Sequence, residues 1–176
     1  GQIVFDAGTG NNTVVNLGSV GGIVLNGPAG PQGPATTLLP RNQLINYGPA
    51  LQTSDPSVIP TLSLFAGASI GVINNFAGGT GFALNLIGGA GPDVLYNAAA
   101  GLPSIHMEAG SSPDLGNWKF PVGNFLQNDG AGVQAITYLG ALDGSPDFVL
   151  NTGDKVQNLS VQGGWGFNLV QNFGSG

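Results

Sequence analysis

Apolar and polar residues alternate along much of the chain with a period of two, which is typical of β-strands that bury one face. The longest such stretch is TLSLFAGASIGVI, residues 61–73, in which the even positions are apolar and the odd positions are mostly small. Shorter alternations follow in GFALNL (81–86), VQAITYL (133–139) and WGFNLVQNF (165–173). We therefore expect one long strand over 61–73 and shorter strands at the three later places.

Clusters of Gly, Asn and Asp separate these stretches, for example DAGTGNN (6–12), IGGAGPD (87–93), QNDGAG (127–132) and NTGD (151–154). Residues that favour helices are scarce, and glycine interrupts nearly every window long enough for a helix. Many short strands joined by such turns predict an all-β fold, namely an antiparallel β-sandwich or jelly-roll-like domain. INNFAGG (73–79) resembles VQNFGSG (170–176), but two copies without a third at a fixed spacing do not indicate a regular solenoid.

Residues 28–60 break this rhythm, because they hold seven of the twelve prolines, at positions 28, 31, 34, 40, 49, 56 and 60. Proline removes a backbone donor, so this segment is a poor candidate for a central strand. Its first part, GPAGPQGPA (27–35), contains three collagen-like triplets and favours a local polyproline II conformation. We expect one domain over 1–176, with 28–60 as a Pro-rich extended arm or covering loop.

Charged residues make up only 7% of the chain, with three basic and nine acidic side chains and a net charge of −6. Three scattered cations cannot form the basic surface that nucleic acids or anionic membranes require, so we expect neither partner. The chain has no cysteine, which excludes disulfides and thiolate metal sites. Low charge with abundant Gly and Asn favours an extracellular or cell-surface protein.

The segment GGAGPDVLY, residues 88–96, resembles the glycine-rich nonapeptide of repeats-in-toxin proteins at every fixed position. That resemblance implies a stack of such copies in which aspartates of successive turns share calcium, with Asp93 as the calcium ligand here. Other segments match the nonapeptide only in part, and calcium takes six to eight oxygen ligands. The alternative is that Asp93 belongs to a Gly-Pro-Asp turn, and no other metal or cofactor is expected.

His106 and Glu108 in SIHMEAG (104–110) are the only His and the only Glu. In a strand both would point to one face, either as two metal ligands or as a polar pair in solvent. We find no Gly-x-Ser-x-Gly elbow for a serine nucleophile, and Asp143 and Asp147 lie in the turn-like DGSPD. No catalytic residue is predicted, and we expect a protein that is not an enzyme.

Three functions are compatible with this sequence. We expect first a non-enzymatic structural subunit of an extracellular filament, sheath or surface layer, whose copies associate by β-strand addition and through the arm. The first alternative is a secreted adhesin or carbohydrate-binding module, with or without calcium. Its sugar platform would draw on Trp118, Phe120, Phe125, Trp165 and Phe167. The second alternative is an outer-membrane β-barrel, whose strands alternate in the same way.

Overall fold

The computed structural model describes residues 1–28, 41–51, 54–55, 57–110 and 123–176. Within these ranges the chain forms fourteen short strands. None of the described residues forms a helix long and apolar enough to cross a membrane. The prediction of an all-β fold is therefore confirmed for the described part of the chain.

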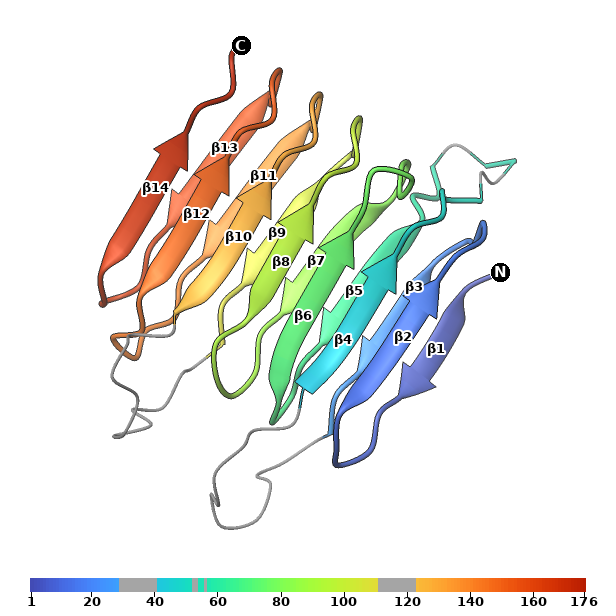
Figure 1. Cartoon of the computed structure of the whole chain (residues 1–176), viewed down its shortest axis with the longest axis horizontal. Coiled ribbons are helices and arrows are strands. Elements are labelled where there is room, and N and C mark those ends of the chain that lie inside the picture. The colour runs from blue at the N-terminus through green and yellow to red at the C-terminus, as the bar shows by residue number, and fades with distance from the viewer. Residues whose placement is uncertain (29–40, 52–53, 56, 111–122) are drawn as a thin grey trace.

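Odd-numbered strands form one seven-stranded sheet and even-numbered strands form another (Figure 1). The odd sheet contains β1 (Ile3–Asp6), β3 (Ile23–Asn26), β5 (Thr61–Phe65), β7 (Ala83–Ile87), β9 (Ile105–Glu108), β11 (Ala135–Leu139) and β13 (Asn158–Gln162). The even sheet contains β2 (Asn12–Asn16), β4 (Arg41–Asn46), β6 (Ile70–Asn75), β8 (Val94–Asn97), β10 (Asn124–Asn128), β12 (Asp147–Asn151) and β14 (Asn168–Asn172).

Each strand pairs in parallel with the strand two places further along the chain. The chain thus crosses from one sheet to the other after every strand and returns one position further along, so that two strands make one coil. The result is a two-sided parallel β-solenoid whose sheets face each other. The two sheets begin in the same coil, made of β1 and β2, and end in the same coil, made of β13 and β14.

The predicted antiparallel sandwich is therefore wrong, since all strand pairs in both sheets are parallel. Strands of parallel sheets usually read as continuous apolar runs because helices cover both faces. Here each sheet is covered on its inner face only, by the other sheet, so the alternation that usually marks antiparallel strands is preserved. The short turns that would suit antiparallel neighbours lead instead into the opposite sheet.

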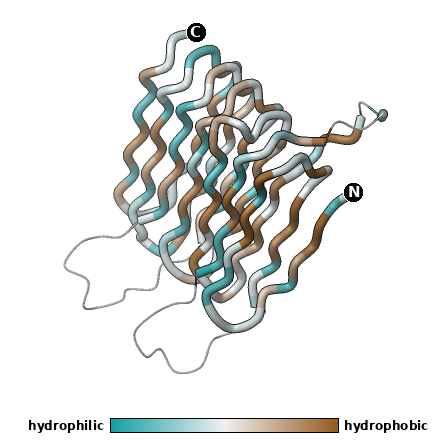
Figure 2. The backbone as a smooth tube through the Cα atoms, turned by 45° about the vertical axis from the view of Figure 1, so that its right-hand side comes forward, coloured by the Kyte–Doolittle hydropathy of each residue, from teal (hydrophilic) through white to brown (hydrophobic). Residues whose placement is uncertain are grey.

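The core lies between the sheets and consists of the inward side chains of successive coils. Leu25, Leu64, Leu86, Met107 and Tyr138 form one such inward row in the odd sheet, all fully buried. In the even sheet the corresponding row is Leu44, Ile73, Leu95, Leu126 and Val149. Hydrophobic segments of neighbouring strands accordingly lie side by side in Figure 2.

Two expectations about individual segments need correction. Residues 61–73 do not form one strand, because Gly67 at φ 63 turns the chain from β5 in the odd sheet towards β6 in the even sheet. Within 28–60, residues 41–46 form β4, which is paired on both sides by β2 and β6. An arm that is extended over all of 28–60 is therefore wrong for these six residues, while residues 29–40 lie outside the described ranges.

Candidate functional site

A ladder of asparagine side chains runs through the last position of every strand in the even sheet. We call it the asparagine ladder; it consists of Asn16, Asn46, Asn75, Asn97, Asn128, Asn151 and Asn172. In each of the first six, Nδ2 donates to the Oδ1 of the next asparagine at 2.6–2.8 Å. The second N–H of each donating amide binds a backbone carbonyl in the turn that follows its own strand. The buried amides of the ladder are therefore satisfied within the solenoid.

The ladder has a direction, because each of its six bonds is donated towards the C-terminal end. Asn172 accepts from Asn151, but no described residue accepts a bond from its Nδ2. Asn16 donates to Asn46 and to Gly18, but no described residue donates to its Oδ1. The C-terminal end of the ladder thus presents a donor and its N-terminal end presents an acceptor.

A second polar row occupies the beginning of the strands in the even sheet, and Asp93 belongs to it. Asp93 is fully buried directly before β8. Its Oδ1 accepts the backbone N–H of Gly71 at 2.6 Å, and its Oδ2 accepts those of Gly89 and Gly110 at 3.1 Å. Burial raises its pKa to about 6, and these three backbone hydrogen bonds only partly oppose that effect.

Asp93 is the candidate calcium ligand, and the structure places backbone N–H groups, rather than other carboxylates, around its oxygens. Among the described residues there is no group of three or more His, Cys, Asp or Glu side chains that could hold a metal ion. The carboxylate joins three successive coils through hydrogen bonds. Its geometry is that of a structural acceptor at a bend between the sheets.

Asp147 occupies the same row two coils further along and is also buried. Its Oδ1 accepts from Nδ2 of Asn124 at 3.2 Å and from the hydroxyl of Tyr138 at 2.7 Å. Burial, and then the bond to Asp147, raises the pKa of Tyr138 above its usual range. Asp143 lies in the preceding turn and accepts from the backbone N–H and the hydroxyl of Ser145. The two aspartates therefore bind different local partners and do not form a carboxylate pair.

His106 and Glu108 lie on the outer face of the odd sheet, as predicted for alternate residues of one strand. Nε2 of His106 is 3.1 Å from Oε1 of Glu108, and both side chains are partly exposed. The neighbouring outward positions on β7 and β11 are Asn85 and Thr137. His106 and Glu108 therefore form a polar contact at the solvent-exposed surface.

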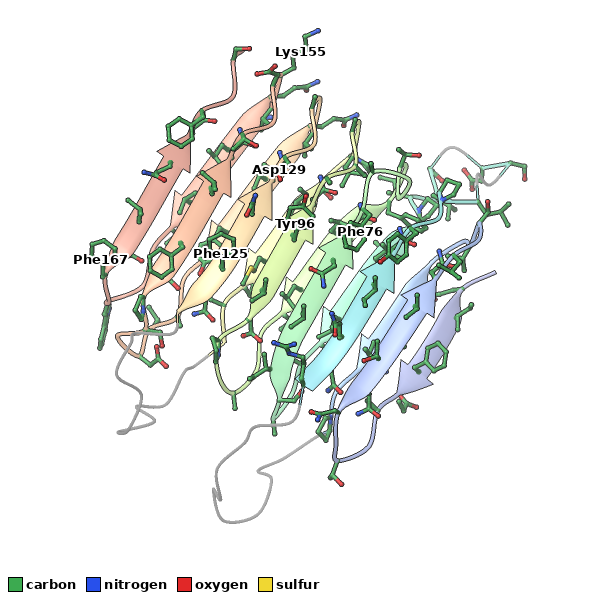
Figure 3. The ribbon with its side chains drawn as sticks, viewed as in Figure 1. Phe76, Tyr96, Phe125, Asp129, Lys155 and Phe167 are labelled. Carbon is green, nitrogen blue, oxygen red and sulfur yellow. The ribbon has the colours of Figure 1, made fainter. Side chains whose placement is uncertain are left out.

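Of the aromatic residues considered for a sugar platform, the structure describes Phe125, Trp165 and Phe167. Trp118 and Phe120 lie outside the described residues. Phe125 lies on β10, on the outer face of the even sheet, whereas Phe167 is exposed in the turn before β14 (Figure 3). Trp165 is exposed in the same turn. Phe167 approaches Phe148, with ring centroids 6.1 Å apart.

Sequence reasoning missed a different aromatic cluster beside the asparagine ladder. Tyr47 and Phe76 follow the ladder residues of β4 and β6, and their rings stack at 4.6 Å with an interplanar angle of 5°. Tyr96 packs edge-on against Phe76 at 6.0 Å (Figure 3). Aligning the sequence on the ladder asparagines would have predicted this cluster, because each of its aromatic residues is next to a ladder asparagine in the sequence.

Both ends of the solenoid expose apolar strands. At the N-terminal end, Ile3, Val4 and Phe5 of β1 and Val15 of β2 are exposed. A hollow of about 320 Å³ between these two strands is lined by Phe5, Val14 and Leu25 among others. At the C-terminal end, all five residues of β14 are exposed. No described residue forms a further strand on either side, so each end presents two free strand edges.

The ladder has a sequence signature that was overlooked. Every strand of the even sheet ends in Asn, with an apolar residue two positions earlier. Successive ladder residues are separated by 30, 29, 22, 31, 23 and 21 positions. The unequal coil lengths concealed the repeat, since a search for a fixed period finds none.

Comparison with known proteins identifies no relative: no family model, no curated protein and no solved structure matches this chain.

Proposed function

We propose that this protein is a non-enzymatic structural subunit that assembles with copies of itself through the ends of its solenoid, in an extracellular filament, sheath or surface layer. The observation that carries this proposal is the pair of uncovered ends. Each end offers unpaired backbone groups from two strands together with exposed apolar side chains. Such edges are templates for the addition of another strand.

The charge pattern supports association. The N-terminal coil carries Asp6 and the C-terminal coil carries Asp154 and Lys155, while β2, β13 and β14 contain no charged residue. Few charges therefore have to be brought together or desolvated when two ends meet.

The interior of the molecule supports a structural role over a catalytic one. The buried polar residues Asp93 and Asp147 are held by backbone and side-chain hydrogen bonds between coils. No buried side-chain nitrogen or oxygen of the described residues lacks a hydrogen-bond partner. Groups that are engaged in this way stabilise the coil stack.

The test is the mass of the purified chain in solution as a function of concentration, by light scattering, together with negative-stain imaging. We expect masses in integral multiples of the subunit and, at high concentration, filaments of constant width. The same result is expected with calcium and with a chelator. A monomer at every concentration in both buffers would contradict end-to-end assembly.

The Tyr47–Phe76 stack favours one alternative function, a carbohydrate-binding module. Tyr47 is 46% exposed, and its ring lies parallel to that of Phe76. An exposed aromatic face can stack on the apolar face of a sugar ring. A glycan array would test this alternative, with binding expected to disappear in Tyr47→Ala and to persist in Trp165→Ala.

A further inference from the structure

We infer that copies of this chain stack head to tail, with the asparagine ladder continuing from Nδ2 of Asn172 in one copy to Oδ1 of Asn16 in the next. This inference rests on the proposed end-to-end assembly and specifies which ends meet and in which orientation. The partner at each end is a second copy of this chain, because the two ends are complementary in hydrogen bonding, strand direction and packing.

The hydrogen bonding of the ladder favours a contact between unlike ends. The amide of Asn172 offers N–H groups that no described residue accepts, and Oδ1 of Asn16 receives no bond from a described residue. A head-to-tail contact adds to the ladder one bond of the same kind as the bonds already in it. A contact between two C-terminal ends would instead bring two amides together that each have their Oδ1 engaged by Asn151.

Strand direction leads to the same orientation. All neighbouring strands are parallel, and both sheets end in the same coil. When β1 and β2 of one copy follow β13 and β14 of another, both sheets continue in parallel without a change in register. Two like ends could pair only in antiparallel fashion, which would interrupt the ladder and the inward rows.

Packing is also complementary across this junction. If the observed register continues, Val170 of β14 lies opposite Val14 of the next copy, and Val161 of β13 lies opposite Phe5. Val14 and Phe5 line the hollow of about 320 Å³ at the N-terminal end. The inward side chains of one copy therefore enter the hollow of the next beside Phe5 and Val14, as between coils of one chain.

Proline can block each end separately because N–H groups alternate between the two edges of a strand. Ile3 and Ala7 donate to the strand beside β1, so the N–H of Val4 faces the free edge. Phe173 donates to Asn151, so the N–H of Val170 also faces the free edge. The same alternation directs the N–H of Val15 and that of Val161 outward. Proline at these four positions removes no internal backbone bond.

The experiment uses an N-blocked variant, Val4→Pro with Val15→Pro, and a C-blocked variant, Val161→Pro with Val170→Pro. Matched controls carry Thr at the same positions, which keeps the N–H. Circular dichroism verifies that each variant keeps its β-structure; Lys at the same positions replaces Pro where a variant misfolds. Masses are measured for each variant alone and for the 1:1 mixture.

Head-to-tail stacking predicts that each blocked variant is monomeric alone and that the mixture forms heterodimers that grow no further. Dimers of either blocked variant alone would show that like ends meet and would overturn the inference, while leaving self-assembly intact. A wild-type chain that is itself monomeric would instead overturn the proposed function. The two failures are therefore distinguishable.

A second variant tests the ladder at the junction. Asn172→Ala removes the donor, and it should weaken assembly by roughly tenfold, the effect of about one hydrogen bond. Gln171→Ala, at the exposed neighbouring position outside the ladder, is the control and should assemble as the wild type does. Equal assembly of the two variants would overturn the continuation of the ladder through Asn172.

Discussion

At the scale of single residues, the fold depends on side-chain amides that serve as hydrogen-bond partners for backbone groups. A coil must bury the polar turn that leads from the even sheet to the odd sheet, and asparagine provides two donors and an acceptor there. Asn97 shows the full pattern. Its amide donates to Asn128 and to the carbonyl of Ala99, while its Oδ1 accepts from Asn75 and from the N–H of Ala99.

Replacing Asn97 by Ala should therefore destabilise the protein strongly. Oδ1 of Asn128 and the N–H of Ala99 lose the partner that Asn97 provides, in a region closed to water. We expect a loss of roughly 2–4 kcal/mol in the free energy of unfolding. Urea denaturation measures it, with Asn74→Ala on the outer face as the control, expected within about 0.5 kcal/mol of the wild type. Similar losses in both variants would contradict the role of the ladder.

Asp93 makes stability depend on pH in an unusual direction. Its pKa is about 6 in the folded protein, above the ordinary aspartate value of 3.8 that applies to the unfolded chain, so the folded state binds the proton more tightly. The stability from protonated Asp93 is fully present below about pH 4 and is lost as pH rises through about 6. The difference corresponds to roughly 3 kcal/mol.

The measurement is urea denaturation between pH 4 and pH 7 for the wild type and for Asp93→Asn, whose side chain does not titrate. We expect the difference in unfolding free energy between the two proteins to change across this range, with the wild type gaining relative to the variant as pH falls. Because the other acidic groups are the same in both proteins, their contributions cancel. A difference independent of pH would contradict the raised pKa of Asp93.

At the scale of elements, the sequence predicts strands well and their pairing poorly. The inward faces of GFALNL and VQAITYL are confirmed by buried Leu84, Leu86, Ile136 and Tyr138. The alternation of apolar and polar residues identifies which side chains are buried. When one face of a sheet is exposed to solvent, however, parallel and antiparallel strands show the same alternation. The pairing is encoded in the asparagine ladder, whose spacing of 21–31 residues hides it from a fixed-period search.

Close contact between coils also depends on the turn that follows each ladder residue. A Cβ added at Gly153 would overlap the carbonyl oxygen of Gly130 in the preceding coil, and one at Gly130 would overlap that of Ala99. These glycines allow the turns to stack at the distance set by the sheet hydrogen bonds.

Gly153→Ala should therefore force the last coils apart and lower the free energy of unfolding by about 1–3 kcal/mol. Gly8→Ala is the matched control, because nothing lies within 4 Å of a Cβ at Gly8. Thermal unfolding of both variants measures the effect. A Gly153→Ala protein as stable as the control would show that the stacked turns have room to adjust.

At the scale of the whole molecule, the solenoid is a one-dimensional stack in which each coil contacts only its neighbours. An internal coil is stabilised from two sides and a terminal coil from one side. The terminal strands are also the exposed ones, since every residue of β1 and of β14 is accessible to solvent, whereas β5 and β10 are largely buried. Local stability should therefore fall from the middle of the stack towards both ends.

Amide hydrogen exchange, read out on peptides by mass spectrometry, can measure this gradient and also test assembly. In the monomer we expect the slowest exchange in β5 to β10 and the fastest in β1, β2, β13 and β14.

When copies join at their ends, each terminal coil gains the neighbour that it lacks, so its exchange should slow with increasing concentration while exchange in the middle stays constant. Protection that rises uniformly along the chain would point to association through the sheet faces, and protection at one end only would point to contact between like ends. Slowing at both ends together is the result that a head-to-tail stack requires, because every junction covers one end of each kind.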